Sequence, residues 1–185
     1  MKIIESLILY LNIFNYYMET IDIFTDGSTL NNQQAGKRVG GAGVFFGDND
    51  PRNISMPMKE NKKTKVTNQV AELTACIKAI ENAYSSGYLG SKKIHIYTDS
   101  MYIVNSIASW ARNWEKNDWK KADNKPIKNL HLIKKLYFYT RNFQVIFKHV
   151  KAHKSKPSDE DSEEYRLWYG NFMADKLATD AAKRL

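Results

Sequence analysis

The chain has 185 residues, enough for one domain with a substantial core, and its 43% apolar content argues against disorder. Its net charge of +8 and pI near 9.4 favour a polyanionic partner. Cys76 is the only cysteine, which excludes an internal disulfide or a cysteine-built zinc site and favours a reducing, cytoplasmic setting. No apolar run approaches the roughly 20 residues that span a membrane.

The first 19 residues look like an extension that precedes a domain at residues 20–185. Residues 3–14 are mostly apolar, as in a signal peptide, but polar residues interrupt the run and no small-residue cleavage site follows it. Two interpretations remain: an extra helix that lies on the domain, and an upstream extension of a protein whose native start is Met18. We favour the second because the recognisable domain begins at Thr20.

The first half of the domain predicts three strands and a helix. Residues 21–25 predict a strand that runs into a turn at Asp26-Gly27-Ser28, and the glycine-rich residues 40–43 lead into a second strand at 44–46. A short third strand is expected at 54–58, and three such neighbours suit an antiparallel meander. The helix that follows has an apolar stripe at helical spacing. Its members are Val70, Leu73, Ile77, Ile80 and Tyr84.

The second half predicts strands that alternate with helices. The expected elements are strands at 94–98 and 144–150 and helices at 101–110, 128–140 and 169–183. Ser100 is a natural N-cap, and Phe172, Leu177 and Ala181 are among the apolar positions of the last helix. The order predicts an α/β fold with a five-stranded mixed sheet, three antiparallel strands and then two parallel ones, flanked by helices.

Two aspartates follow matching strand ends, Ile-Phe-Thr-Asp and Ile-Tyr-Thr-Asp. Asp26 and Asp99 would each, taken alone, be an ordinary turn or cap residue. Adjacent strands would place both at the sheet edge where open α/β sheets bind ligands. Two carboxylates at 4 Å repel by roughly 1 to 4 kcal/mol, depending on screening. A divalent cation would offset that repulsion, and oxygen ligands suit magnesium.

Two further acids are weaker candidates when taken alone. Glu72 lies off the apolar stripe, on the side of its helix that carries Ala75, Ala79 and Ala83. Those small residues predict a face that other structure approaches closely, although a plain surface glutamate is equally compatible with the pattern. Asp175 falls in the second turn of the expected last helix, where an aspartate is usually just solvated.

Four segments resemble the signature blocks of type 1 ribonuclease H, in that family's order and at suitable separations. They are Thr25-Asp26-Gly27-Ser28, Thr67-Asn68-Gln69-Val70-Ala71-Glu72-Leu73, Thr98-Asp99-Ser100-Met101-Tyr102 and Asn171-Phe172-Met173-Ala174-Asp175-Lys176-Leu177-Ala178. The resemblance covers about residues 20 to 183. It implies a ribonuclease H-like fold and an endonuclease that hydrolyses the RNA strand of RNA–DNA hybrids without sequence preference, leaving 5′-phosphate and 3′-hydroxyl ends.

The resemblance also implies a catalytic carboxylate quartet of Asp26, Glu72, Asp99 and Asp175 that holds two Mg²⁺ ions, with Mn²⁺ as a substitute. By family analogy Asp26 bridges both ions, Asp175 helps hold the ion that activates water, and Glu72 and Asp99 hold the other. A metal pair roughly 3.5–4 Å apart supplies an activated water, an in-line geometry and charge neutralisation at the leaving oxygen. A Ser–His or Cys–His nucleophile is not required.

The segment His149-Val150-Lys151-Ala152-His153 resembles the family's Val-Lys-Gly-His loop. The likeness makes His153 a catalytic histidine that assists proton transfer and product release. A zinc motif is disfavoured because the spacing falls on a strand and a loop. Ala152 replaces the usual glycine, and the loop up to Asn171 is longer than in compact members and holds the five acids of 159–164. Both departures bear on loop mobility.

The basic protrusion, residues 110–128, interleaves tryptophans with lysines and carries a net charge of +3. It resembles the protrusion with which cellular members of the family grip the DNA strand, although an amphipathic helix with buried tryptophans is the simpler alternative. The residues expected to bind nucleic acid are Trp110, Trp114, Trp119, Lys120 and Lys121. Trp110 and Trp114 are expected to pack together.

Residue-by-residue matching implies further contacts with the hybrid. Thr67 and Asn129 would form a pocket for a DNA phosphate. Asn32, Asn68 and Gln69 would face the minor groove, where 2′-hydroxyls are read. Met101 stands where a glutamine is common, so one groove contact is expected to be missing. We expect a monomer that binds no membrane.

Three alternatives compete with the catalytic interpretation. A non-enzymatic hybrid-binding module is disfavoured because all four carboxylates are present. A ribonuclease H domain detached from a reverse transcriptase is disfavoured because such domains often lack the basic protrusion. An actin-like or sugar-kinase half would need phosphate-binding loops and a much longer chain.

Overall fold

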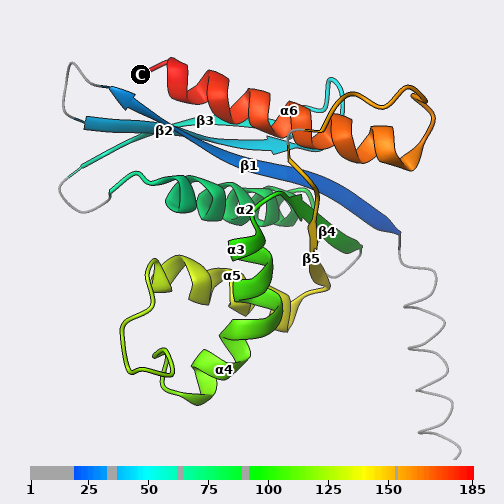
Figure 1. The fold of residues 1–185 in the computed structure, drawn as a ribbon. Coiled ribbons are helices and arrows are strands. Elements are labelled where there is room, and N and C mark those ends of the chain that lie inside the picture. Colours follow the sequence, from blue (N-terminus) through cyan, green and yellow to red (C-terminus); the bar gives the residue numbers. More distant parts are fainter. Residues whose placement is uncertain (1–18, 33–36, 62–64, 89–91, 153) are drawn as a thin grey trace, which may run out of the picture.

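A computed structural model describes residues 19–32, 37–61, 65–88, 92–152 and 154–185 (Figure 1). The prediction of an N-terminal extension therefore falls almost entirely on residues outside the described ranges. Within those ranges, no helix has the length and apolar character needed to cross a membrane.

The described residues form a five-stranded mixed sheet, which confirms the predicted architecture. The strands are β1 Thr20–Asn32, β2 Lys37–Phe45, β3 Ile54–Lys59, β4 Lys93–Thr98 and β5 Val145–His149. Their spatial order is β3-β2-β1-β4-β5. The pairs β1–β2 and β2–β3 are antiparallel, and the pairs β1–β4 and β4–β5 are parallel. The strand β1 is thus the centre of the sheet and the junction between its two halves.

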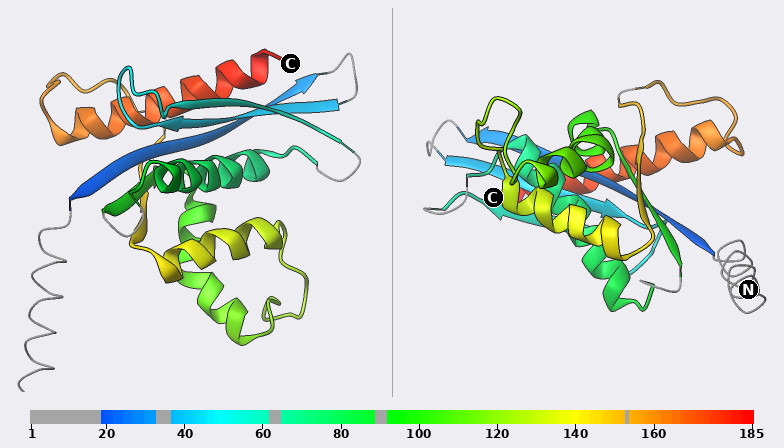
Figure 2. Two further views of the ribbon diagram at one scale, coloured as in Figure 1. Left: turned by 180° about the vertical axis from the view of Figure 1, so that it is seen from behind. Right: turned by 90° about the horizontal axis from the view of Figure 1, so that it is seen from below.

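Helices cover both faces of this sheet (Figures 1 and 2). They are α2 Asn68–Ser85, α3 Met101–Asn105, the π-helical η1 Ser106–Trp110, α4 Ala111–Lys116, α5 Leu130–Asn142 and α6 Glu163–Lys183. The long helix α6 lies on one face and α2 on the other, with α3 to α5 packed beyond α2 (Figure 1). Figure 2 shows the same layers from behind and from below.

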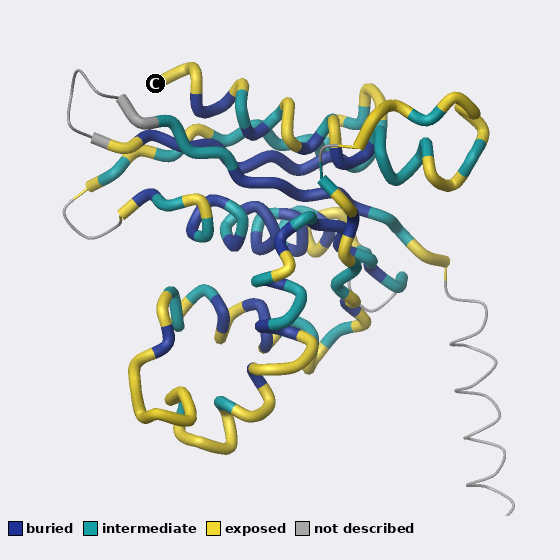
Figure 3. The backbone as a smooth tube through the Cα atoms, viewed as in Figure 1, coloured by how far each residue is buried: buried dark blue, intermediate teal, exposed yellow. Residues whose placement is uncertain are grey.

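Alternation along the central strand supplies a separate apolar layer to each face. Ile23 points into the larger core with Leu73 and Ile80 of α2, all 0% exposed. The next residue, Phe24, points the other way and packs with Tyr97 and Ala174 beneath α6. Figure 3 shows this burial running through the strands and α2, while the outer segments are exposed. The two layers hold α2 and α6 against opposite faces of the same strand.

The predicted turn at residues 26–28 is wrong, because β1 continues to Asn32. Beyond Phe24, which pairs with Tyr97, the strand loses β4 as a neighbour but keeps β2. There it pairs with the glycine-rich part of β2, where Asp26 is opposite Gly43. Backbone pairing with β2 therefore overrides the local turn preference of Asp-Gly-Ser. Asp26 lies where β1 becomes open on one side.

Three helical predictions also need correction. The last helix begins at Glu163, not at residue 169, because Ser162 caps it and accepts a hydrogen bond from the Tyr165 N–H at 3.1 Å. The acids of its first turn favour the positive end of the helix dipole. Tyr84 is 65% exposed and Phe172 is 47% exposed, so neither belongs to an apolar core. The helix expected at 101–110 continues through a π-helical turn to Lys116.

Candidate active site

The carboxylate quartet converges on one cleft of about 680 Å³. Asp26 comes from the middle of β1, Glu72 from α2 and Asp175 from α6, and Asp99 directly follows β4. The sequence prediction that these acids lie together is therefore supported by their placement. The cleft wall also includes residues from the loop before α6 and from α6 itself. These are Lys151, Ala152, Lys154, Trp168, Asn171 and Phe172.

Two glycines set how closely the helices approach Asp26. A Cβ atom at Gly27 would lie 2.1 Å from the backbone nitrogen of Glu72, so α2 rests directly on the backbone of β1. A Cβ atom at Gly43, the β2 partner of Asp26, would lie 2.1 Å from the carbonyl oxygen of Ala174. The helix α6 thus touches the sheet one residue before Asp175. Because glycines at positions 27 and 43 have no side chain, the backbones of α2 and α6 contact the backbones of β1 and β2 directly. Glu72 and Asp175 are thereby brought close to Asp26.

Asp26 is buried, with 8% of its surface exposed. Burial, together with the charges of Asp99, Asp175 and Glu72, raises its pKa to about 8, and the Gly27 N–H, which donates to Oδ1 at 2.7 Å, opposes this shift. A carboxyl group with these neighbours strongly resists ionisation unless positive charge is supplied. The negative potential of the cleft therefore centres on Asp26.

Glu72 is oriented by two side chains. The Ser100 hydroxyl donates to Oε2 at 2.6 Å, and the Asn68 amide donates to Oε1 at 2.7 Å. Burial raises the pKa of Glu72, and the bond from Ser100 opposes that change. Ser100 lies at the expected N-cap position of α3, but its hydroxyl makes no capping bond. The Ser100 hydroxyl is bonded to the Glu72 carboxylate and therefore does not cap the helix.

Similarity to known proteins agrees with this arrangement. The sequence model of the ribonuclease H family matches residues 18–183. The chain belongs to the ribonuclease H family. Ribonuclease H of Schizosaccharomyces pombe is 38% identical over 160 residues, which cover 86% of this chain and 52% of the relative. Ribonuclease H of Ruthia magnifica is 32% identical over 170 residues, covering 91% and 99%.

A solved structure supports the same assignment. The crystal structure of a type 1 ribonuclease H with the type 2 active-site motif matches with a TM-score of 0.63 and 25% identity, over 90% of this chain and 74% of that one. The present chain spans about half the length of the S. pombe relative and nearly the whole of the Ruthia one.

The ribonuclease H family generally uses divalent metal ions, and the cleft suits them. Its donors are carboxylate oxygens, the ligands that Mg²⁺ and Mn²⁺ prefer. The raised pKa of Asp26 reflects unbalanced negative charge that a cation would offset. Among the described residues, no group of three or more His, Cys, Asp or Glu side chains is already arranged as a metal cluster.

We expect Asp26→Asn to stabilise the metal-free protein at alkaline pH. Folded Asp26 keeps its proton up to about pH 8, whereas its ordinary value is 3.8, so the stability of the wild type falls as pH rises between these values. Asparagine does not ionise and escapes this loss. In EDTA at about pH 8.5, the melting temperature of the variant should exceed that of the wild type by about 2–4 °C, which corresponds to about 1 kcal/mol in the free energy of unfolding. An equal difference in melting temperature at about pH 5 would contradict this origin.

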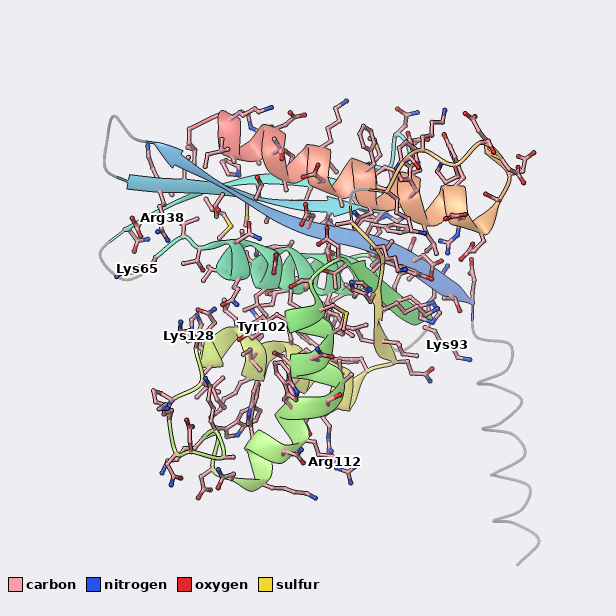
Figure 4. All side chains as sticks on the ribbon, viewed as in Figure 1. Arg38, Lys65, Lys93, Tyr102, Arg112 and Lys128 are labelled. Atoms are coloured by element: carbon pink, nitrogen blue, oxygen red, sulfur yellow. The ribbon has the colours of Figure 1, made fainter. Side chains whose placement is uncertain are left out.

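The residues expected to contact the hybrid lie at the ends of helices and of β1. Thr67 caps α2, and its hydroxyl accepts a hydrogen bond from the Val70 N–H at 3.2 Å. Asn129 precedes α5 with a left-handed backbone (φ 55°). Beside it, the Tyr102 hydroxyl donates to the Lys128 carbonyl oxygen at 3.5 Å, and Figure 4 shows these two residues together. Asn32 ends β1 and Gln69 is half-buried in the first turn of α2.

The basic protrusion combines both interpretations offered for it. The ring centroids of Trp110 and Trp114 lie 5.7 Å apart, so the two side chains pack together as predicted. Trp114 and Trp119 pack against the core, and Trp119 contacts Tyr137 with ring centroids 5.7 Å apart. Trp110 is 39% exposed, and Lys120 and Lys121 are exposed. The tryptophans therefore anchor a segment whose lysines face solvent.

His153 lies outside the described residues. Lys151, Ala152 and Lys154, which are described, line the cleft. The sequence did not predict that Trp168 and Phe172 line the cleft, or that Ser100 donates a hydrogen bond to Glu72. Trp168 precedes the helix start predicted at residue 169, so it was not assigned to a helix. Ser162 and the acids that follow it are a helix start signal that could have placed Trp168 in α6.

Proposed function

We propose that this chain is a metal-dependent endonuclease that hydrolyses the RNA strand of RNA–DNA hybrids, with its catalytic domain at residues 20–185. The observation that carries the proposal is the convergence of the carboxylate quartet, from separate elements, on the buried Asp26. Membership of the ribonuclease H family supports the reaction class. A monomeric state and a cytoplasmic location stay predictions.

We assign the quartet to two Mg²⁺ ions, with Mn²⁺ as a substitute. Ions held there would activate a water and neutralise charge on the phosphate and its leaving oxygen. Asp26 would be the central ligand, because the backbone contacts at Gly27 and at its β2 partner Gly43 bring α2 and α6 close to it. Ser100 and Asn68 fix the carboxylate of Glu72 and spare it a reorganisation cost on binding.

The remaining roles follow from exposure. Asp175 is the exposed member of the quartet, and Thr179 donates to its Oδ1 at 3.3 Å, so it borders the side from which substrate and water arrive. His153, between two cleft residues, would carry protons to and from the reacting phosphate. Hydrolysis of this kind yields a 5′-phosphate and a 3′-hydroxyl.

Hybrid binding would come from the basic protrusion and from the ends of α2 and α5. The exposed lysines of the protrusion attract phosphates without reading bases. Thr67 and Asn129 would hold a DNA phosphate, and Asn32, Asn68 and Gln69 would face the minor groove. We therefore expect little sequence preference and a steep salt dependence.

Replacing Lys120 and Lys121 together with alanine is expected to weaken hybrid binding equally for all sequences. Each lost phosphate contact should reduce the slope of log affinity against log salt by about 1. Lys93→Ala, on the opposite side of the molecule in Figure 4, is the control and should leave the slope unchanged. Fluorescence anisotropy across a salt series measures it. Equal slopes for the double variant and the wild type would exclude the protrusion as the phosphate-binding segment.

The proposed function is tested by giving wild-type protein five labelled substrates in Mg²⁺. These are an RNA–DNA hybrid labelled on either strand, single-stranded RNA, duplex RNA and duplex DNA. Only the RNA strand of the hybrid should be cut, with 5′-phosphate ends. Hybrid binding without cutting, in both Mg²⁺ and Mn²⁺, would favour a non-catalytic binding module.

A further inference from the structure

The N-terminal part of α6 presents aromatic side chains to the cleft. Trp168 and Phe172, here called the aromatic wall, both line it. Their rings stack with centroids 5.4 Å apart and planes inclined by 12°. Phe172 is 47% exposed, so a large apolar face borders a cleft that is otherwise rich in carboxylates. An exposed aromatic face beside charged groups offers a surface on which another planar group can stack.

The aromatic wall is held in place from both sides. The Trp168 indole Nε1–H donates to the Lys154 carbonyl oxygen at 3.0 Å, which fixes the ring against the preceding loop. Two residues earlier, Arg166 turns toward the sheet and pairs with Asp22 at 2.7 Å. Its guanidinium also lies 5.4 Å from the centre of the Tyr97 ring. The first turns of α6 are therefore anchored to the sheet, and the wall is a rigid surface.

Positive charge lies next to the aromatic wall. Lys151 and Lys154 line the same cleft and are exposed. Lys154 forms a surface ion pair with Glu164 at 2.8 Å, and such a pair is weak enough to exchange for a phosphate. The cleft therefore offers a group for each part of one nucleotide. The aromatic rings suit the base, the lysines suit a phosphate, and the carboxylates lie where the bond would be cut.

A base within a duplex has neighbouring bases on both faces and offers none to a protein ring. Stacking on an aromatic side chain therefore selects an unpaired nucleotide. We propose that the aromatic wall stacks the base of an unpaired ribonucleotide where the hybrid passes into single-stranded RNA, beside the phosphate to be cut. This inference rests on the proposed function and names a preferred substrate for it, a hybrid with a single-stranded RNA tail.

The test uses wild-type protein with blunt hybrids and with hybrids that carry a short RNA tail at the 5′ or 3′ end. The fluorescent base 2-aminopurine occupies the first unpaired position, and Ca²⁺ replaces Mg²⁺ to prevent cutting. Stacking on Phe172 should quench the fluorescence for one tail polarity. That tailed hybrid should bind more tightly than the blunt one by roughly fivefold or more.

Phe172→Ala should abolish the quenching and the advantage of the tailed hybrid, whereas Phe172→Tyr, which keeps a ring, should retain both. Phe138→Ala removes an exposed aromatic from α5, outside the cleft lining, and should behave as wild type. No quenching with either tail, or quenching that survives Phe172→Ala, would overturn the proposal, as would an equal loss of affinity for blunt and tailed hybrids. Cleavage of the blunt hybrid by wild-type protein in Mg²⁺ tests the proposed function separately.

Discussion

Asp26→Asn is expected to reduce cleavage of the RNA strand by about 10³-fold or more in Mg²⁺. Asp26 is the buried acid whose pKa the charges of the other three raise, so it is the position where bound cations would gain most from a negative ligand. Losing several kcal/mol of charge stabilisation, at about 1.4 kcal/mol per factor of ten in rate, gives that magnitude. Initial rates on a labelled hybrid at saturating substrate measure it.

The same substitution is expected to raise stability in EDTA at alkaline pH, so a fall in rate would not reflect unfolding. Such opposite effects are typical of functional acids, whose burial costs stability. Asp180→Asn, an exposed position of α6, makes the same chemical change outside the cleft and should leave both properties unchanged. An Asp26→Asn protein that cuts within tenfold of the wild-type rate would remove Asp26 from the reaction.

Gly27→Ala is expected to damage folding and activity together. The new methyl group would lie 2.1 Å from the Glu72 nitrogen and 2.4 Å from the Ala71 carbonyl carbon, and backbone atoms do not rotate away. The helix α2 must move outward, which should lower the free energy of unfolding by about 3 kcal/mol. A displacement of about 1 Å at Glu72 is enough to cost about 10²-fold in rate. Denaturant unfolding and cleavage assays measure the two losses.

Gly87→Ala separates this steric effect from the general cost of replacing a glycine. Gly87 follows α2 in a left-handed conformation (φ 75°), and nothing lies within 4 Å of the position that a Cβ atom would occupy there. Only backbone strain of about 1 kcal/mol is expected, with full activity. If Gly27→Ala were no more harmful than Gly87→Ala, direct backbone contact between β1 and α2 would not be what positions Glu72.

The sheet and the placement of the acids were predictable because each depends on a short-range pattern. Apolar strands that are separated by segments with helical periodicity indicated that the strands are parallel. The residues that follow adjacent parallel strands lie at the same edge of the sheet. Asp99 follows from that rule, whereas Asp26 lies within β1 and reaches the same edge because the pairing of β1 with β4 ends at Phe24. The small residues beside Glu72 indicated close packing, and Ala75, Ala79 and Ala83 are indeed fully buried.

Other features depend on contacts between distant segments and were not predictable from local pattern. The strand β1 runs past Asp26 because the glycines of β2 pair with it, 17 residues away at Gly43. Ser100 faces Glu72 because α2 and the end of β4 meet in the cleft. Phe172 fits the apolar period of α6, but it faces the cleft and not the sheet, since the sheet-facing positions are taken by residues such as Ala174.

The most direct test compares Asp175→Asn with Asp180→Asn on a hybrid labelled in its RNA strand. Both aspartates are exposed residues of α6, but only Asp175 lines the cleft. If the quartet performs the reaction, Asp175→Asn should lose at least about 10²-fold in rate in Mg²⁺, while Asp180→Asn cuts like the wild type. Equal cutting by the two variants would contradict the assignment of this cleft as the active site.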